Sequence, residues 1–549
     1  MRQARPLSFS PDGSQLLIAS NEPGSDQLFV WPGMRRVTFD EEKVGGQFLP
    51  DGRILVERDA GGNERTQLYA GDEPLVVDER YKHDTPHSAG RTLAYATNRR
   101  NGVDFDVVAR DLASGEERVF AIGGYVGVAA ISPDGRRIVA ERMGERSGDN
   151  DLFLCDVDTG EVTHLTPHEG AVEHATPLFR GNELMWATNE GRDTLAVGAV
   201  ESQWDLTCYG DPAGRALLIV ENADGYSRLT IAGEEVQLPG RGVVESPVFS
   251  ADGSRLAYAF SSPTQPKGVW LYDLRSGRLE KVTGDEAPAG LVEPELHRFA
   301  SFDGESIPVF TFTPEGAGPF PVVVMVHGGP EAQWVPEWHV NYVPLAQYLV
   351  SRGYAVAVPN VRGSTGYGKR YEHLDDVRLR LDSVEDLRAL HGWLAARSEI
   401  DASRAVVYGR SYGGYMVLAA LAFQPDLWAA GIESVGISSF VTFLENTSPY
   451  RRAVREREYG SLERDRDFLV EASPITHVDR MRAPLFIQHG ANDPRVPLSE
   501  SEEIARVLRE KGVRCELVVY PDEGHSIAKL PNRIDAFARA AAFLEEVVG

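Results

Sequence analysis

Cysteine and long apolar stretches are scarce in this sequence. Its three cysteines, Cys155, Cys208 and Cys515, are scattered and odd in number, which favours neither a disulfide framework nor a thiolate metal site. No apolar stretch approaches the roughly 20 residues of a membrane-spanning helix. The N-terminus, MRQARPLSFSPDG, lacks the apolar core of a signal peptide. We therefore expect a cytoplasmic protein.

Positive charge is also in short supply. The chain has 56 basic and 82 acidic residues, a net charge of −26. A surface of this sign repels nucleic-acid phosphates and anionic lipid, so neither nucleic acid nor a membrane is an expected partner. No phosphate loop or dinucleotide fingerprint is present, and we expect no cofactor. His164 and His168 have the spacing of a metal pair, but Pro167 lies between them in a hairpin context, and we expect no metal site.

A short phrase repeats through the first half of the chain. With 549 residues the chain is too long for one hydrophobic core, so two or three domains are expected. Each copy of the phrase reads as strand, glycine-containing turn and strand, and most copies add a second hairpin. The turn glycines are Gly13, Gly52, Gly90, Gly135, Gly181, Gly214 and Gly253.

Four short strands in about 40 residues is the period of a propeller blade. Seven phrases predict a seven-bladed β-propeller over residues 1–288. The fifth and sixth copies are degenerate, so six or eight blades stay open, and a β-sandwich is the alternative fold. A polar linker at residues 284–294, GDEAPAGLVEP, ends the repeat.

The second half, residues 289–549, has a different pattern. Uninterrupted apolar runs alternate with helix-length amphipathic segments, which predicts a parallel sheet that is buried on both faces. The runs include residues 321–329, 354–363, 405–411 and 484–493. We expect an α/β domain.

The stretch AVVYGRSYGGYM places Ser411 between a β-prone run and a helix-forming segment, with glycines on both sides. This pattern is typical of a nucleophile elbow, in which serine occupies a strained strand-to-helix turn. Asp493 and His525 each follow a later apolar run, and the order Ser, Asp, His is that of an α/β-hydrolase. Loops at the carboxyl ends of parallel strands meet at one edge of the sheet. We expect His525 to act as base and Asp493 to orient it.

A tetrahedral intermediate also needs hydrogen-bond donors for its oxyanion. The candidates are the main-chain N–H groups of Gly328 or Gly329 in the stretch HGGP, and that of Tyr412 directly after the serine. His327 and His489 end strands beside these residues, and we expect them to be structural.

Five motifs in this half resemble those of the prolyl oligopeptidase family of serine peptidases. They are HGGP (327–330), NVRGSTGYG (360–368), GRSYGGYM (409–416), GANDPRVP (490–497) and PDEGH (521–525). HGGP is more similar to the acylaminoacyl-peptidase branch. The resemblance implies a propeller that limits access to a cavity between the domains, and an arginine, here Arg495, that binds a substrate carbonyl. The family often places a helix before the propeller, for which this chain has almost no room.

The expected function is hydrolysis of short peptides, N-acylated peptides included, through an acyl-enzyme, by an acylaminoacyl-peptidase or an oligopeptidase. A carboxylesterase, a dipeptidyl peptidase and a non-catalytic propeller-based binding protein are the alternatives. Phe440 and Phe443 are candidates for the wall of an apolar S1 pocket, with core packing as the alternative. The oligomeric state stays open, a homo-oligomer included. Dipeptidyl peptidases of the family anchor the substrate amine on paired glutamates, for which the candidates are Glu41-Glu42, Glu116-Glu117 and Glu234-Glu235.

Overall fold

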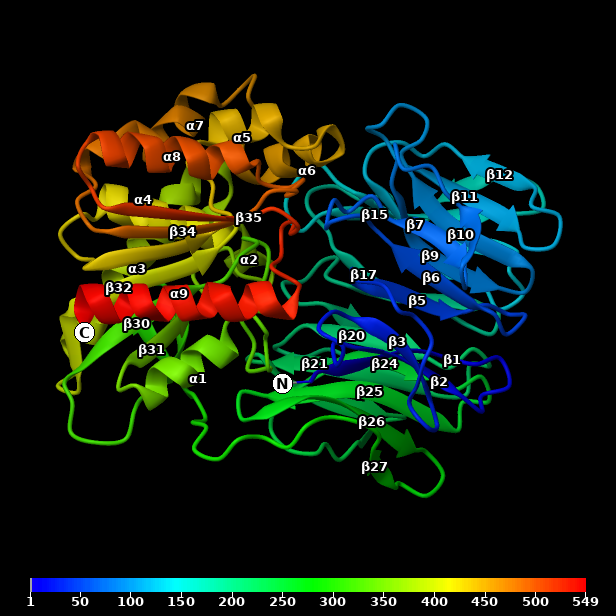
Figure 1. Cartoon of the computed structure of the whole chain (residues 1–549). Coiled ribbons are helices and arrows are strands. Elements are labelled where there is room, and N and C mark those ends of the chain that lie inside the picture. The colour runs from blue at the N-terminus through cyan, green and yellow to red at the C-terminus, as the bar shows by residue number, and fades with distance from the viewer. Residues whose placement is uncertain (1) are drawn as a thin grey trace. The chain divides into compact units, whose positions relative to one another are not determined.

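The computed structural model of the protein describes residues 2–549 (Figure 1). The chain divides into two compact units. The first comprises the chain up to Ala60, residues 64–286 and residues 367–369. The second comprises residues 61–63, 287–366 and 370–549. No helix among residues 2–549 is both long and apolar enough to cross a membrane.

The first unit is a ring of seven small antiparallel sheets in chain order. Blade one consists of β1 (Ala4–Phe9), β2 (Leu16–Ser20), β3 (Gln27–Trp31) and β4 (Arg35–Arg36). Blade two consists of β5 (Val44–Phe48), β6 (Ile54–Arg58), β7 (Gln67–Ala70) and β8 (Glu73–Val76). Blade three consists of β9 (His83–Ala89), β10 (Thr92–Thr97), β11 (Asp106–Asp111) and β12 (Glu117–Phe120). Blade four consists of β13 (Val126–Ile131), β14 (Arg137–Met143), β15 (Asn150–Asp156) and β16 (Val162–His164). Blade five has only three strands, β17 (His174–Arg180), β18 (Glu183–Thr188) and β19 (Ala196–Val197). Blade six consists of β20 (Leu206–Gly210), β21 (Leu217–Ala223), β22 (Tyr226–Ile231) and β23 (Glu234–Glu235). Blade seven consists of β24 (Val243–Phe249), β25 (Arg255–Ser262), β26 (Gln265–Asp273) and β27 (Leu279–Lys281).

The repeated phrase forms the turn between the first two strands of each blade. All seven turn glycines have positive φ, from 57° at Gly90 to 86° at Gly52, a conformation that glycine adopts without steric cost. In the SPDG copies a serine hydroxyl donates to the aspartate two positions on, as Ser10 does to Asp12 at 2.6 Å. The same bond recurs from Ser132 to Asp134, and from Ser250 to Asp252 in the copy that reads SADG. The predicted count of seven blades is confirmed.

Neighbouring blades pack through apolar side chains. Leu17, Ala19 and Leu28 of blade one, for example, form a buried cluster with Val44 and Val56 of blade two. A second cluster joins the first blade to the last, with Leu16 and Ile18 against Ala257 and Val269. Among the described residues no strand of blade one pairs with a strand of blade seven. Side-chain packing therefore carries most of the closure of the ring.

The second unit contains an eight-stranded sheet with the order β28-β29-β31-β30-β32-β33-β34-β35. The strands are β28 (Glu295–Ala300), β29 (Ser306–Phe312), β30 (Phe320–Val326), β31 (Ala355–Pro359), β32 (Ile400–Arg410), β33 (Ala430–Ser434), β34 (Leu485–Gly490) and β35 (Cys515–Tyr520). From β31 through β35 neighbouring strands are parallel, as the apolar runs predict. The antiparallel hairpin β28–β29 at one edge was not predicted.

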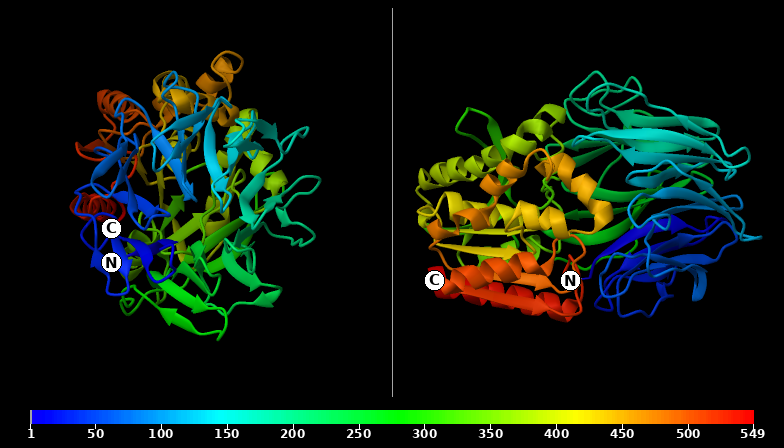
Figure 2. Two further views of the ribbon diagram at one scale, coloured as in Figure 1. Left: turned by 90° about the vertical axis from the view of Figure 1, so that its right-hand side faces the viewer. Right: turned by 90° about the horizontal axis from the view of Figure 1, so that it is seen from above.

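Helices cover both faces of this sheet, with α3 on one face and α9 on the other (Figure 2). The helices are α1 (Val343–Ser351), α2 (Lys369–Glu372), α3 (Arg380–Ala395), α4 (Tyr412–Phe423), α5 (Phe440–Asn446), α6 (Pro449–Tyr459), α7 (Arg466–Ala472), α8 (Leu498–Glu510) and α9 (Leu530–Val548). The central strands are buried on both sides, and Val323, Val324 and Val407 have no exposed surface. The loops at the carboxyl ends of these strands lie at one edge of the sheet.

Two buried histidines make the propeller sensitive to acid. His83 and His174 lie in the inner strands β9 and β17, each 1% exposed, and neither ring makes a hydrogen bond to a described residue. Burial lowers the pKa of each to about 4, with Arg99 acting in the same direction on His83 and His168 on His174.

Between about pH 6.5 and 4 these two histidines therefore bind more protons in the unfolded chain than in the folded one, so their contribution to stability falls as the pH falls through this range. We expect the double variant His83→Phe/His174→Phe to lose less stability than the wild type between pH 7 and pH 5. Urea midpoints at the two pH values measure this. Equal losses in the two proteins would contradict the assignment.

Candidate active site

Ser411 occupies the turn between β32 and α4 with φ 59° and ψ −119°. A non-glycine residue in this region of backbone space carries strain of about 1–3 kcal/mol, which the surrounding structure must offset. The main-chain N–H of Ser411 donates to the carbonyl of Ser434 at 2.9 Å, and its carbonyl accepts from the N–H of Tyr415. The strained turn is thus held by β33 on one side and by the first turn of α4 on the other.

The glycines around Ser411 are required by close backbone packing. A Cβ on Gly409 would collide with the carbonyl of Gly413. A Cβ on Gly413 would collide with the carbonyl oxygen of Val326 and lie 2.8 Å from that of His327. A Cβ on Gly414 would lie 2.6 Å from the Cα of Gly436. The pattern GRSYGG therefore lets the elbow sit directly against the ends of neighbouring strands.

His525 bridges Ser411 and Asp493. Its Nε2 lies 3.1 Å from the Oγ of Ser411, and its Nδ1 lies 2.7 Å from the Oδ2 of Asp493. Because a carboxylate only accepts, Nδ1 carries the proton and Nε2 is left to accept from the serine hydroxyl. The other oxygen of Asp493 accepts the N–H groups of Arg495 at 2.8 Å and Val496 at 3.1 Å. The structure therefore brings together Ser411, His525 and Asp493, the three residues predicted from their order in the chain, and links them by hydrogen bonds.

The surroundings of this trio fix its protonation at neutral pH. Burial lowers the pKa of His525 to about 4, against the opposing effect of Asp493, and Arg410 and Arg495 lower it further. Burial alone would raise the pKa of Asp493, but the neighbouring His525 holds that pKa below its ordinary value. The imidazole is therefore neutral and the carboxylate ionised, as a general base and its orienting group require.

His489 and His327 hold the loops of the site. The ring of His489 is fully buried, contacts the Ser501 hydroxyl at 2.7 Å and donates to the Val496 carbonyl at 3.0 Å. His327 contacts the carbonyl of Gly328 at 2.8 Å and the hydroxyl of Ser364 at 2.9 Å.

Gly328 is brought against the nucleophile. A Cβ on Gly328 would lie 3.4 Å from the Cβ of Ser411 and 2.9 Å from the carbonyl oxygen of Arg410, so the main chain passes beside the serine. Gly329 follows with φ 141°, which favours glycine. Tyr412 is the first residue of α4, so its N–H lies in the helical turn that begins at the serine. The main chain of both predicted segments therefore lies beside Ser411, and their role as oxyanion donors stays a prediction.

The loop NVRGS supports this arrangement in a way that the sequence does not reveal. The side chain of Asn360 accepts from the N–H of Trp334 at 2.7 Å and donates to its carbonyl at 3.0 Å. Arg362 is buried and pairs with Asp386 at 2.9 Å and with Asp303 at 3.0 Å. The partners are distant in the chain, so the only signal in the sequence is the motif itself.

A buried ionic cluster lies behind Tyr412 and was also missed. The guanidinium of Arg380 pairs with Asp375 and Glu458, and donates to the Tyr412 hydroxyl at 3.1 Å. Ser383 contacts the same hydroxyl at 2.8 Å. Carboxylate oxygens of Asp375, Asp376 and Glu458 lie near enough to one another to hold a metal ion, but the guanidinium of Arg380 already pairs with two of the three. The cluster fixes the tyrosine that follows the nucleophile.

Phe440 and Phe443 are 1% and 2% exposed and belong to an aromatic cluster. The ring of Phe440 lies 4.6 Å from that of Tyr415 and 4.7 Å from that of Tyr459, and Phe443 lies 6.0 Å from Tyr459. The packing fits the core alternative, and a role in an S1 pocket stays a prediction. Arg495 is placed by its main chain, which donates to Asp493 and accepts from Thr447.

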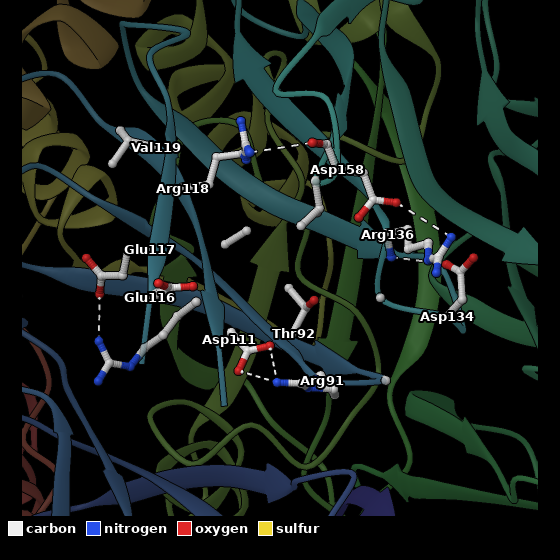
Figure 3. A pocket seen from close by; sticks show the side chains of 15 residues that line it. Arg91, Thr92, Asp111, Glu116, Glu117, Arg118, Val119, Asp134, Arg136 and Asp158 are labelled. Carbon is white, nitrogen blue, oxygen red and sulfur yellow. Dashed lines mark hydrogen bonds and ion pairs between the residues drawn. The ribbon is translucent and has the colours of Figure 1, made fainter. Parts of the chain in front are cut away.

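A separate hollow of about 1030 Å³ lies in the first unit (Figure 3). Charged residues of both signs line it and several are paired, as Arg91 is with Asp111 at 3.0 Å. Glu116 and Glu117, one of the candidate amine anchors, lie here. Glu117 already pairs with Arg110 at 3.0 Å and accepts from the Tyr95 hydroxyl at 2.8 Å. The negative charge of Glu117 is therefore largely balanced by these neighbouring groups.

Comparison with known proteins gives the family. The model of the prolyl oligopeptidase family matches residues 338–549. Dipeptidyl peptidase family member 6 of Caenorhabditis elegans is 34% identical, over 99% of this chain and 85% of that protein. The chain belongs to the prolyl oligopeptidase family. It is a serine peptidase, as the motifs predicted.

Two further similarities concern the acylaminoacyl-peptidase branch of the family and the fold of the whole chain. The human acylamino-acid-releasing enzyme is 26% identical to this peptidase, over 47% of this chain and 35% of the enzyme. A puromycin-hydrolyzing peptidase of Mycobacterium tuberculosis has a TM-score of 0.86 at 20% identity, covering 99% of this chain and 94% of that one. The predicted fold class, a β-propeller with an α/β-hydrolase domain, is confirmed.

The packing of the elbow predicts that Gly413→Ala lowers stability by about 2–3 kcal/mol and abolishes most activity, because the new methyl group meets rigid backbone. Gly392→Ala in α3 is the matched control, since a Cβ there has no described neighbour within 4 Å. We expect that variant to gain about 0.5–1 kcal/mol. Urea unfolding and peptidase assays of both variants test this, and an active, stable Gly413→Ala would refute the packing argument.

Proposed function

We propose that the protein hydrolyses short peptides, N-acylated peptides included, through an acyl-enzyme on Ser411. The observation that carries this proposal is the pair of contacts from Ser411 through His525 to Asp493, at 3.1 and 2.7 Å, on a strained elbow. His525 takes the serine proton as Ser411 attacks the scissile carbonyl and gives it to the leaving amine. Asp493 holds the imidazole and stabilises the imidazolium. A water molecule then releases the acyl group by the same steps.

Main-chain N–H groups stabilise the tetrahedral oxyanion in this proposal. Tyr412 supplies one donor, and Gly328 or Gly329 supplies the other. A single donor of this kind is worth about 3–4 kcal/mol in the transition state.

Substrate binding is assigned to further residues. Arg495 binds a backbone carbonyl of the substrate, for which a planar cationic donor is suited, and Phe440 and Phe443 contribute to the S1 wall. Residues 289–549 form the catalytic domain, and residues 1–288 form a gating domain that limits access to short peptides.

Removal of N-terminal dipeptides is a second candidate. It is favoured by the name of the C. elegans relative, which matches 99% of this chain, whereas the human acylamino-acid-releasing enzyme matches 47%.

Product analysis by mass spectrometry tests these functions. One short peptide is presented with a free and with an acetylated N-terminus, and Ser411→Ala serves as the blank. We expect the blank to lose at least about 10⁴-fold in kcat/KM, because the nucleophile is gone. Full activity of this variant would refute the proposed route.

The products distinguish the branches. A single acetylated residue released only from the blocked peptide indicates an acylaminoacyl-peptidase, and internal cuts in both forms indicate an oligopeptidase. Dipeptides released only from the free form indicate the dipeptidyl activity. Cleavage of a matched ester without cleavage of the amide indicates a carboxylesterase. If an organophosphonate does not label Ser411, the propeller-based binding protein is favoured.

The pKa of His525 sets the acid limb of the pH profile. Only the neutral imidazole accepts the serine proton, so kcat/KM falls as the pH falls through this pKa. Since burial and the two arginines lower that pKa, we expect the acid limb below pH 6.5, the ordinary value for histidine. Initial rates between pH 4 and 8 measure it. An acid limb above pH 6.5 would contradict the electrostatic assignment.

A further inference from the structure

Arg410 connects the two segments that carry the reacting side chains. It is the last residue of β32 and directly precedes Ser411. Its Nη2 donates to the main-chain carbonyl of His525 and lies 2.8 Å from the Oγ of Ser526. One side chain therefore ties the elbow to the histidine loop across 115 positions of the sequence.

The histidine loop has no regular structure of its own. His525 lies between the end of β35 at Tyr520 and the start of α9 at Leu530. Within the loop, the carboxylate of Glu523 accepts the N–H groups of Ala528 and Lys529, each at 2.9 Å. Those bonds close the loop on itself. The bond from Arg410 fastens the carbonyl of His525 to β32, and thereby to the strand that ends at the nucleophile.

The charge of Arg410 also acts on the imidazole. A guanidinium stays protonated at any working pH, even where burial lowers the pKa of the arginine, as it does here. The charged groups that act on His525 are Asp493, which favours the protonated ring, and Arg410 and Arg495, which disfavour it. Arg410 is thus arranged to favour the neutral ring, which is the form that accepts a proton.

We propose that Arg410 is a positioning residue, which holds His525 in line between Ser411 and Asp493 and favours its neutral form. The inference rests on the proposed function and deepens it. Arg410 has no contact with substrate in this role, so its removal acts on kcat more than on KM. Loss of the tether displaces the base, and small displacements of reacting groups cost up to about 100-fold in rate.

Two substitutions separate the tether from the charge. Arg410→Met keeps an unbranched, flexible side chain but removes the hydrogen-bond donors and the charge, and we expect kcat/KM to fall about 10- to 100-fold with KM within about threefold. Its acid limb moves to higher pH. Arg410→Lys keeps the charge but not the planar fork, so its acid limb stays near that of the wild type while kcat falls.

Arg506→Met is the matched control. Arg506 lies on α8, is about half exposed and pairs with Glu503 and Glu510. The same change in charge and length at this site leaves rate and acid limb as in the wild type. Thermal unfolding of all variants reports whether each is folded.

The test measures kcat, KM and the acid limb with peptide, and in parallel the pH-dependent rate of Ser411 labelling by a fluorophosphonate. Labelling needs the nucleophile and its base but no peptide. An Arg410→Met variant with wild-type rates and acid limb overturns the inference. If it does not fold, Arg410→Lys decides: a reduced kcat with an unchanged acid limb supports the inference, and a wild-type kcat overturns it.

The two readouts also separate this inference from the proposed function. Wild-type cleavage that Ser411→Ala abolishes, with Arg410→Met unaffected, overturns the positioning role alone. Labelling of the wild type without peptide cleavage, slowed in Arg410→Met, overturns the peptidase function and supports the positioning role. Wild-type protein that does not label overturns both.

Discussion

The close approach of three strand ends around Ser411 is the constraint on which the rest of the site depends. The chain after β30 passes so near the start of α4 that Gly413 has no room for a side chain beside Val326. The same approach places Gly328 against Ser411. The main chain can pass this close to the nucleophile only because these positions are glycines. The strain at Ser411 is offset by the bonds that its own main chain makes to β33 and α4.

Sequence reasoning identified those parts whose cause is local or topological. Each blade turn is determined by a few consecutive residues, as the serine–aspartate bond at Ser10 and Asp12 shows, so seven phrases were sufficient to count seven blades. Ser411, Asp493 and His525 could be grouped because the carboxyl ends of parallel strands meet at one edge. The hairpin β28–β29 escaped because its first strand is mostly exposed or half-buried and gives a weak apolar signal.

Other features depend on partners that the sequence does not pair. Arg380 lies 78 positions from Glu458, and no local pattern connects them. Removing one member of such a buried pair typically costs about 3–5 kcal/mol, because the other charge is left uncompensated. Arg362 and Arg380 therefore hold the loops beside the site in one arrangement. For Phe440 and Phe443 the sequence is neutral, since a pocket wall and a core have the same aromatic composition.

The seam of the propeller, where blade one packs against blade seven, affects how the chain folds. Within a blade the strands are joined by short turns, so blades form from contacts that are local in sequence. The seam instead joins residues as far apart as Gly13 and Arg255, separated by 242 positions. Loop-closure entropy rises with the length of the loop, and here few hydrogen bonds offset it. The contacts that close the ring are therefore among those of greatest sequence separation in this unit, and we expect them to form after the contacts within the blades.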